Sequence, residues 1–359
     1  MDRRSVIRHA GIAGVLAAGV APAVHAQAAI RWRLASSFPK SVDALFGTAE
    51  AFAAHMKAMS GGKFEISVHA PGELMPPLGV VDGVQQGTVE MGHTAPYYYF
   101  GKNECFALGT AIPFGLNSRQ MTAWMYDGNG MKLMREFYAK YNIVSFPAGN
   151  TGSQMGGWFR KEIKSLADVK GLKMRIGGFG GKVLERLGAV PQNIPGGEIY
   201  QALEKGTIDA AEWIAPYDDQ KLGFNKVAPY YYYPGWWEGS AQADFFINTK
   251  AYEALSPEYK AMVETAASSA HVLMQARYDA RNPAALKQLV GAGTKLRAFS
   301  RDVMNEAFKQ SMALYSELSG KNEDWKKIYA DYSKFRADQN LWFRFTEGTF
   351  DRFMQEQKL

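Results

Sequence analysis

The residues best suited to chemistry lie in one segment, residues 171–181, which joins an arginine to a run of glycines. Arg175 ends a strand-like stretch, and Gly177 and Gly178 begin a turn that opens a helix. A guanidinium is a planar, two-pronged donor for a carboxylate, and backbone amides at a helix start add further donors. The segment therefore predicts a carboxylate receptor. A tight turn beside a solvated arginine is the alternative.

The motifs of common enzymes are incomplete in this sequence. Residues 152–156 resemble a nucleophile elbow without its Gly-x-Ser-x-Gly spacing, and Gly181-Lys182 lacks the rest of a phosphate-binding loop. Cys105 is the only cysteine, which excludes cysteine-held iron–sulfur clusters and c-type haem. No metal-ligand spacing joins the histidines beyond residue 26, which are His55, His69, His93 and His271. We therefore predict a binding protein and not an enzyme.

Polar residues gather where the chain is predicted to cross between two domains. The first crossing holds Asn150 and Gln154, and the second holds Glu238 behind two tryptophans. Glu212 and Trp213 end a strand between the two crossings. Because segments that cross between domains line the cleft where ligands are held, we expect these side chains at a binding site. Exposed surface carboxylates are the alternative interpretation of the two glutamates.

The chain is organised as two similar halves. A helix, a glycine and a short strand follow one another at residues 82–93, and the same order recurs at residues 201–212. The tripeptide Ala-Pro-Tyr follows each copy. Repeated helix–strand units of this kind predict two α/β domains, each with its own sheet. Ligands of open α/β sheets lie beyond the carboxyl ends of the strands, so the two halves should share one cleft.

The region after Leu255 is predicted to be mostly helical. Pro283 is expected to kink the first of these helices or to end it early. The predicted helices span residues 257–290, 301–318, 322–335 and 339–354. The last of them carries an aromatic stripe, which predicts packing against its own domain or against a second subunit, so that a homodimer is one of two options.

The N-terminus resembles an export signal. Residues 1–26 begin with arginines, continue as an apolar run and close on Val24-His25-Ala26. The Arg3-Arg4 pair suggests the twin-arginine route, with ordinary secretion as the alternative. The formal net charge is +6 without long lysine or arginine runs, so nucleic acid is not an expected partner. We predict a protein of the bacterial periplasm.

Three segments together resemble one known family. Residues 168–175, 198–209 and 245–248 resemble the substrate-binding proteins of tripartite ATP-independent periplasmic (TRAP) transporters, and the likeness extends over nearly all of the chain beyond the signal. The 2-oxoacid-binding branch of this family is similar in Gln154, Arg175, Glu212-Trp213 and the stretch from Trp236 to Gly239.

The resemblance implies a two-domain α/β periplasmic binding protein of the venus-flytrap kind, with mixed sheets, crossover hinge segments and long C-terminal helices. Its approximate domains are residues 27–150 with 241–280, and residues 151–240 with 281–359. The implied function is to bind a small 2-oxoacid such as pyruvate and to deliver it to the membrane permease subunits. A C4-dicarboxylate, a sugar acid or a hydroxyacid with calcium is the alternative cargo, and a periplasmic enzyme acting on carbonyl acids is the more distant one.

The resemblance further implies that the ligand binds at Arg175 beside a metal cation held by Gln154, Glu212, Trp213 and Glu238. Charge agrees with a cation, because two glutamates and a carboxylate ligand leave an excess of negative charge after Arg175 cancels one. Carboxylate, amide and carbonyl oxygens suit a hard ion. Charge counting alone favours a divalent ion, whereas the resemblance favours sodium, which we prefer to calcium. Asn150 and Tyr98 are predicted to complete the substrate site.

Overall fold

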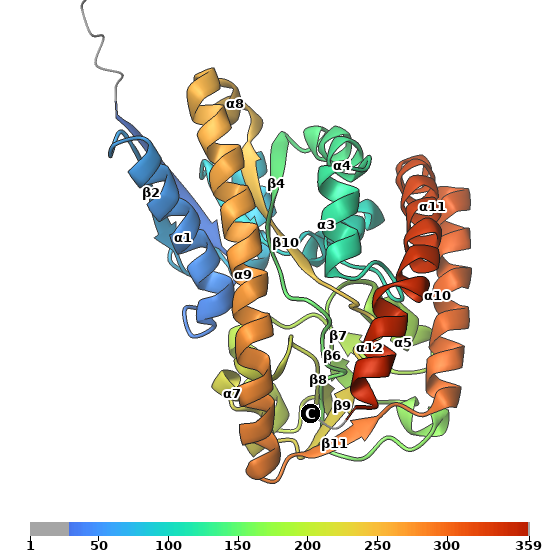
Figure 1. Cartoon of the computed structure of the whole chain (residues 1–359). Helices are drawn as coiled ribbons and strands as arrows, with labels where there is room; N and C mark the ends of the chain where they lie inside the picture. Colours follow the sequence, from blue (N-terminus) through green and yellow to red (C-terminus); the bar gives the residue numbers. More distant parts are fainter. Residues whose placement is uncertain (1–28, 358–359) are drawn as a thin grey trace, which may run out of the picture.

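The computed structural model describes residues 29–357, and these form two mixed sheets, each covered by helices (Figure 1). The predicted signal, residues 1–26, lies outside the described residues. We call the part built on the first sheet lobe I and the part built on the second sheet lobe II. Among the described residues, no helix is long and apolar enough to cross a membrane.

The sheet of lobe I has five strands, and a late strand is inserted between early ones. Strand β10 pairs antiparallel with both β3 and β4, while β1 pairs parallel with β2 and β3. In spatial order the strands are β2 (Phe64–His69), β1 (Ile30–Ser36), β3 (Met91–Thr94), β10 (Gln242–Asn248) and β4 (Ile143–Asn150).

The sheet of lobe II has six strands, most of them short. Strand β5 runs antiparallel to both of its neighbours, and the other pairs are parallel. In spatial order the strands are β11 (Lys295–Ala298), β9 (Tyr230–Tyr233), β5 (Trp158–Phe159), β8 (Ala210–Ala211), β6 (Lys173–Arg175) and β7 (Val190–Gln192).

Helices cover both sheets, and one of them extends along both lobes. Helix α9 packs on α1 and β4 in lobe I and on α7 in lobe II (Figure 1). The α-helices are α1 (Asp43–Met59), α2 (Val80–Gln85), α3 (Ser118–Tyr126), α4 (Gly130–Ala139), α5 (Gly178–Arg186), α6 (Ile199–Glu204), α7 (Pro216–Leu222), α8 (Thr249–Glu253), α9 (Pro257–Gly291), α10 (Arg301–Lys321), α11 (Glu323–Phe345) and α12 (Glu347–Gln355). The 3-10 helices are η1 (Pro77–Gly79), η2 (Pro96–Tyr99), η3 (Glu104–Gly109), η4 (Leu166–Val169), η5 (Gly196–Glu198) and η6 (Phe224–Lys226).

The chain crosses from lobe I to lobe II after β4 and returns between β9 and β10. Both crossing segments carry residues that the sequence placed at the site. The two crossings are hydrogen-bonded to each other, since the Thr151 amide donates to the Ala241 carbonyl over 3.0 Å. The domain limits given above remain a prediction.

The two sequence copies adopt the same local structure. Gly87 follows α2 and Gly206 follows α6, and both glycines have φ of +71°, a left-handed conformation that ends a helix at little cost in glycine. Strand β3 comes after the first glycine and β8 after the second. Each copy thus delivers the residue after its strand to the edge of one sheet.

The C-terminal helices correct two expectations. Helix α9 continues through Pro283 to Gly291, so the prediction that this helix ends early at Pro283 is wrong. The missing amide removes one bond from an exposed stretch, while buried Ala285 and Leu289 hold the last turns to the core. Helix α11 is also longer than predicted and ends at Phe345, where Thr346 separates it from α12.

Candidate ligand and cation site

Arg175 and Glu212 meet because neighbouring parallel strands deliver them to the same sheet edge. Strand β6 ends at Arg175, and its partner across the ladder is Ala211, the residue before Glu212. Arg175 Nη1 lies 2.5 Å from Glu212 Oε1, and their side chains are 1% and 0% exposed. A buried ion pair of this kind is costly to break, because the remaining charge would lack a partner.

The arginine fork is only partly available to a ligand. Arg175 Nε donates to the Ile194 carbonyl over 3.0 Å, and Nη1 also donates to the Glu212 carbonyl over 2.6 Å. The Gly177 amide donates to Glu212 Oε1 over 3.0 Å. The predicted receptor amide at Gly177 therefore serves the protein's own carboxylate, since Glu212 sits at the adjacent strand end. Among the described residues, Arg175 Nη2 has no hydrogen-bond acceptor and is the donor left for a ligand.

The two crossing segments place Gln154 beside Glu238. The Gln154 amide donates to the Glu238 carbonyl over 3.2 Å, and the Gln154 carbonyl accepts from the Gly235 amide over 2.9 Å. The Gln154 side chain donates from Nε2 to Thr151 Oγ1 over 3.2 Å. Its Oε1 therefore points elsewhere and has no partner.

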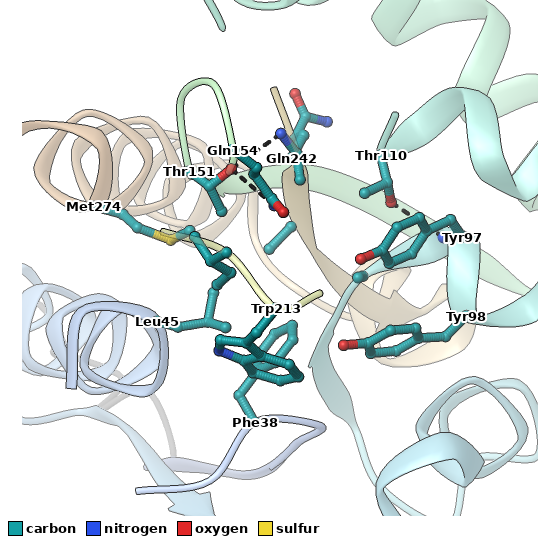
Figure 2. A pocket seen from close by; sticks show the side chains of 14 residues that line it. Phe38, Leu45, Tyr97, Tyr98, Thr110, Thr151, Gln154, Trp213, Gln242 and Met274 are labelled. Atoms are coloured by element: carbon teal, nitrogen blue, oxygen red, sulfur yellow. Dashed lines mark hydrogen bonds between the residues drawn. The ribbon is translucent and has the colours of Figure 1, made fainter. Parts of the chain in front are cut away.

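A small cavity of about 30 Å³ lies between the lobes, below the usual range for ligand sites. In Figure 2 the Tyr97 and Tyr98 side chains extend toward the space between Gln154 and Trp213. The lining residues are Phe38, Leu45, Ala95, Tyr97, Tyr98, Thr110, Thr151, Gln154, Trp213, Ile214, Ala241, Gln242, Ala243 and Met274.

Three of the predicted site residues line this cavity, namely Gln154, Trp213 and Tyr98. The other four do not line it but are buried, and each is adjacent in sequence or hydrogen-bonded to a residue of the site. They are Asn150, Arg175, Glu212 and Glu238.

The sequence did not single out the apolar wall formed by Phe38, Leu45 and Met274. These three residues come from the loop after β1, from α1 and from α9. Their sequence signal was only that of core residues, because Leu45 and Met274 fall on the buried faces of amphipathic helices. A long-range fold was needed to bring them together.

Several buried polar atoms at the site have no hydrogen-bond partner within residues 29–357. The unpartnered oxygens are Gln154 Oε1, Glu212 Oε2 and Glu238 Oε2, and the unpartnered donors are Asn150 Nδ2 and Trp213 Nε1. A buried polar atom without a hydrogen bond costs about 1–3 kcal/mol. Two of these atoms belong to residues that line the cavity and three to buried residues beside it, so the arrangement suits a polar ligand.

The electrostatics of the two glutamates also favour a cation. Burial raises the pKa of Glu212 to about 7, although the charge of Arg175 and the Gly177 amide lower it. Burial and the negative charge of Glu212 together raise the pKa of Glu238 well above its usual value. In the part of the chain that the structure describes, Arg175 is the one cation beside them, so a second positive charge would allow both carboxylates to ionise.

The donor set fits a hard cation. Among residues 29–357, no cluster of three or more His, Cys, Asp or Glu side chains could hold a metal by itself. The oxygens on hand are the two glutamates, Gln154 Oε1 and the Trp213 carbonyl, and such ligands suit sodium or calcium. When bound, the cation would neutralise the carboxylates and offer open positions to oxygens of an anionic ligand.

Asp219 orients the peptide that carries the Trp213 carbonyl. Asp219 Oδ1 accepts from the Ile214 amide over 3.2 Å, and Oδ2 accepts from Trp158 and Tyr231. In a trans peptide the amide N–H and the preceding carbonyl point in opposite directions. The Trp213 carbonyl therefore points away from Asp219, while the Trp213 ring lies 5.1 Å from the Arg175 guanidinium.

Comparison with known proteins places this architecture in one class. The family model described as bacterial extracellular solute-binding protein, family 7, matches residues 35–322. A protein of Nostoc sp. named a monocarboxylate 2-oxoacid-binding periplasmic protein is 48% identical, over 90% of this chain and 89% of its own.

Two solved structures are also similar. A TRAP transporter solute-binding protein of Bordetella bronchiseptica is 52% identical with a TM-score of 0.90, over 91% of this chain and 98% of its own; it is a mixed-occupancy dimer with copurified calcium and picolinate. A TRAP periplasmic solute-binding protein of Pseudoalteromonas atlantica, with bound sodium and pyruvate, is 38% identical with a TM-score of 0.88, over 92% of this chain and 99% of its own.

The two lobes and the buried site between them define a venus-flytrap binding protein of the periplasm. This chain belongs to family 7 of the bacterial extracellular solute-binding proteins, and within it to the solute-binding proteins of TRAP transporters. The fold and the family predicted from the sequence are thereby confirmed.

Proposed function

We propose that this protein captures a small monocarboxylate 2-oxoacid, of the size of pyruvate, together with a metal cation. The observation that carries the proposal is the set of unpartnered buried atoms at the cavity and directly beside it. Acceptors on Gln154, Glu212 and Glu238 accompany donors on Asn150 and Trp213. The acceptors suit the cation, and the donors suit the oxygens of an acid.

The cation and the acid depend on each other in this proposal. The cation allows Glu212 and Glu238 to ionise, and the oxygens of a 2-oxoacid complete its coordination. Arg175 contributes its free Nη2 to the carboxylate, as a single donor and not as a fork. We propose sodium ahead of calcium, because a similar TRAP solute-binding protein was solved with bound sodium and pyruvate, whereas charge counting alone favours a divalent ion.

The cavity lining supports a monocarboxylate and not a C4-dicarboxylate. No lysine, arginine or histidine lines the cavity among the described residues. Arg175 beside it serves the first carboxylate, so a second carboxylate would have no cationic partner. The opposite wall is apolar and contains Phe38, Leu45 and Met274, which suits a short aliphatic tail. We propose no catalytic role, because a captured acid must leave unaltered to be transported.

Delivery follows from the class of protein. We propose that the loaded protein presents its cargo to the permease subunits of a TRAP transporter, after export directed by residues 1–26. The Arg3-Arg4 pair favours the twin-arginine route for that export.

We further propose that the protein forms a homodimer through its C-terminal aromatic patch, defined as Leu341, Trp342, Phe345, Phe350 and Phe353. These side chains are all exposed, Phe345 by 71%, and three of them line a groove between α11 and α12. A surface that offers both a groove and projecting rings can complement a second copy of itself about a twofold axis. Sedimentation should give a dimer for the natural chain and a monomer for Phe345→Ser/Phe350→Ser. An unchanged dimer in the double variant would refute the interface.

The experiment that identifies the cargo starts from protein purified under mild conditions, so that bound small molecules and metal ions are retained. Mass spectrometry of the released small molecules and elemental analysis should find a 2-oxoacid and about one equivalent of sodium or calcium. Calorimetry of the stripped protein with pyruvate, in sodium, in calcium and in choline, should show binding only with a metal cation. Tight binding of succinate, or binding of pyruvate that is equal in choline, would contradict the proposal.

A further inference from the structure

The glycine turn that the sequence singled out, Gly177 and Gly178, does not line the ligand cavity. Gly177 gives its amide to Glu212, and Gly178 begins α5 with φ of +57°. The requirement for two consecutive glycines must therefore come from another contact, one made at their Cα atoms.

An aromatic ring from lobe I lies directly on these two glycines. A Cβ atom at Gly177 would come 2.9 Å from Tyr97 Cζ, and one at Gly178 would come 2.4 Å from Tyr97 Cδ2. All the nearest atoms at both positions belong to Tyr97. Real Cβ atoms do not approach so closely, so only glycine lets the ring reach this depth.

The Tyr97 ring also extends to the ligand cavity and toward Glu238. Tyr97 lines the cavity, stacks on Tyr98 with 5.1 Å between ring centroids, and is 5% exposed. Thr110 Oγ1 accepts from the Tyr97 amide over 3.1 Å and anchors it within lobe I. Burial and then the charge of Glu212 raise the pKa of Glu238, and the charge of Arg175 and the nearby Tyr97 hydroxyl oppose this rise.

We propose that Gly177 and Gly178 form a seat for Tyr97 that is occupied when the lobes close, and that seating brings the Tyr97 hydroxyl to Glu238. The proposal rests on the function proposed above. Tyr97 belongs to η2 in lobe I, whereas Gly177, Gly178 and Glu238 lie on lobe II or on the crossing that leads back from it. A ligand closes the protein only if it binds the closed form more tightly than the open form. The Tyr97 contact further stabilises the closed form, and it couples closure to the cation site through Glu238.

Gly177→Ala is the sharpest test, because its effect should fall on the contact between lobes. The φ of Gly177 is −86°, which alanine adopts freely, and its added methyl meets only Tyr97. Overpacking of this size costs about 1–3 kcal/mol, which corresponds to roughly ten- to a hundredfold weaker binding. The matched control is Gly197→Ala, since a Cβ at Gly197 meets nothing within 4 Å.

The measurements use the full mature chain with pyruvate and sodium chloride. We expect Gly177→Ala to bind pyruvate ten- to a hundredfold more weakly, to compact less in small-angle scattering when pyruvate is added, and to keep the melting temperature of the ligand-free natural chain. Tyr97→Ala removes the ring, so Gly177→Ala/Tyr97→Ala should bind no more weakly than Tyr97→Ala alone.

Two results would overturn the seat. One is natural affinity and compaction in Gly177→Ala. The other is an equal loss of ligand-free stability, which would mean that the contact also exists in the open form. Either result leaves the proposed function intact as long as the natural chain and Gly197→Ala bind pyruvate. Failure of the natural chain to bind any 2-oxoacid would instead reject the function.

Discussion

Replacement of Glu238 by glutamine should affect the stability of the ligand-free chain and its affinity for pyruvate in opposite directions. Glu238 is 2% exposed, its Oε2 has no partner, and among the described residues it forms no ion pair. The raised pKa of Glu238 favours its neutral form in the ligand-free protein, and glutamine is neutral as well, so the substitution adds no buried charge. We therefore expect Glu238→Gln to keep or to raise the melting temperature of the ligand-free chain.

The effect on binding should have the opposite sign. A unit charge about 4 Å from a cation contributes about 4 kcal/mol at an effective dielectric constant of about 20. The amide oxygen retains part of this, so we expect a loss of about 2–4 kcal/mol, or roughly 30- to 1000-fold in affinity. Calorimetry with pyruvate across a sodium series measures it, and the variant should also lose most of its dependence on sodium.

Two further variants serve as a comparison and as a control for Glu238→Gln. Glu212→Gln should weaken binding and also lower stability by about 3–5 kcal/mol, because it leaves Arg175 buried without its partner. Glu204→Gln, an exposed position at the end of α6, should change neither quantity. If Glu238→Gln binds pyruvate like the natural chain, with the same dependence on sodium, the cation site is refuted.

Three other expectations concern pH, the rim of the cleft and the size of the cargo. Glu212, with its pKa raised to about 7, binds a proton that the cation must displace, so affinity should rise with pH between about 5 and 7, by up to tenfold per pH unit for each proton released in calorimetry. Asp43 of α1 bonds to Lys221 on α7 and to Arg281 on α9, so Asp43→Asn should weaken pyruvate binding about two- to fivefold, and high salt should abolish the difference. Met274→Ala enlarges the apolar wall, so competition assays should show a gain for longer 2-oxoacids relative to pyruvate; an unchanged ratio would contradict the assignment of that wall to the tail.

Local patterns in the sequence were enough to predict most of the helices and strands and the class of protein. The apolar spacing of residues 43–59 and the glycines after them are local signals, and they suffice to predict a helix with the bounds of α1. The strand that ends at Arg175 was likewise read correctly. The motifs around Arg175 and Glu212 also identified the family, because they are contiguous in the chain. Pro283 misled the prediction, because tertiary contacts outweigh the loss of one hydrogen bond in a helix of this length.

The tertiary structure alone decided what those residues do to one another. Pairing of β6 with β8 joins Arg175 to Glu212 and takes most of the arginine's donors, which no spacing along the chain reveals. The cavity wall of Leu45 and Met274, and the approach of Tyr97 to Gly177, depend on segments far apart in sequence. Residue types determine which interactions are chemically available, whereas strand order and lobe contact determine which partners are close enough to make them.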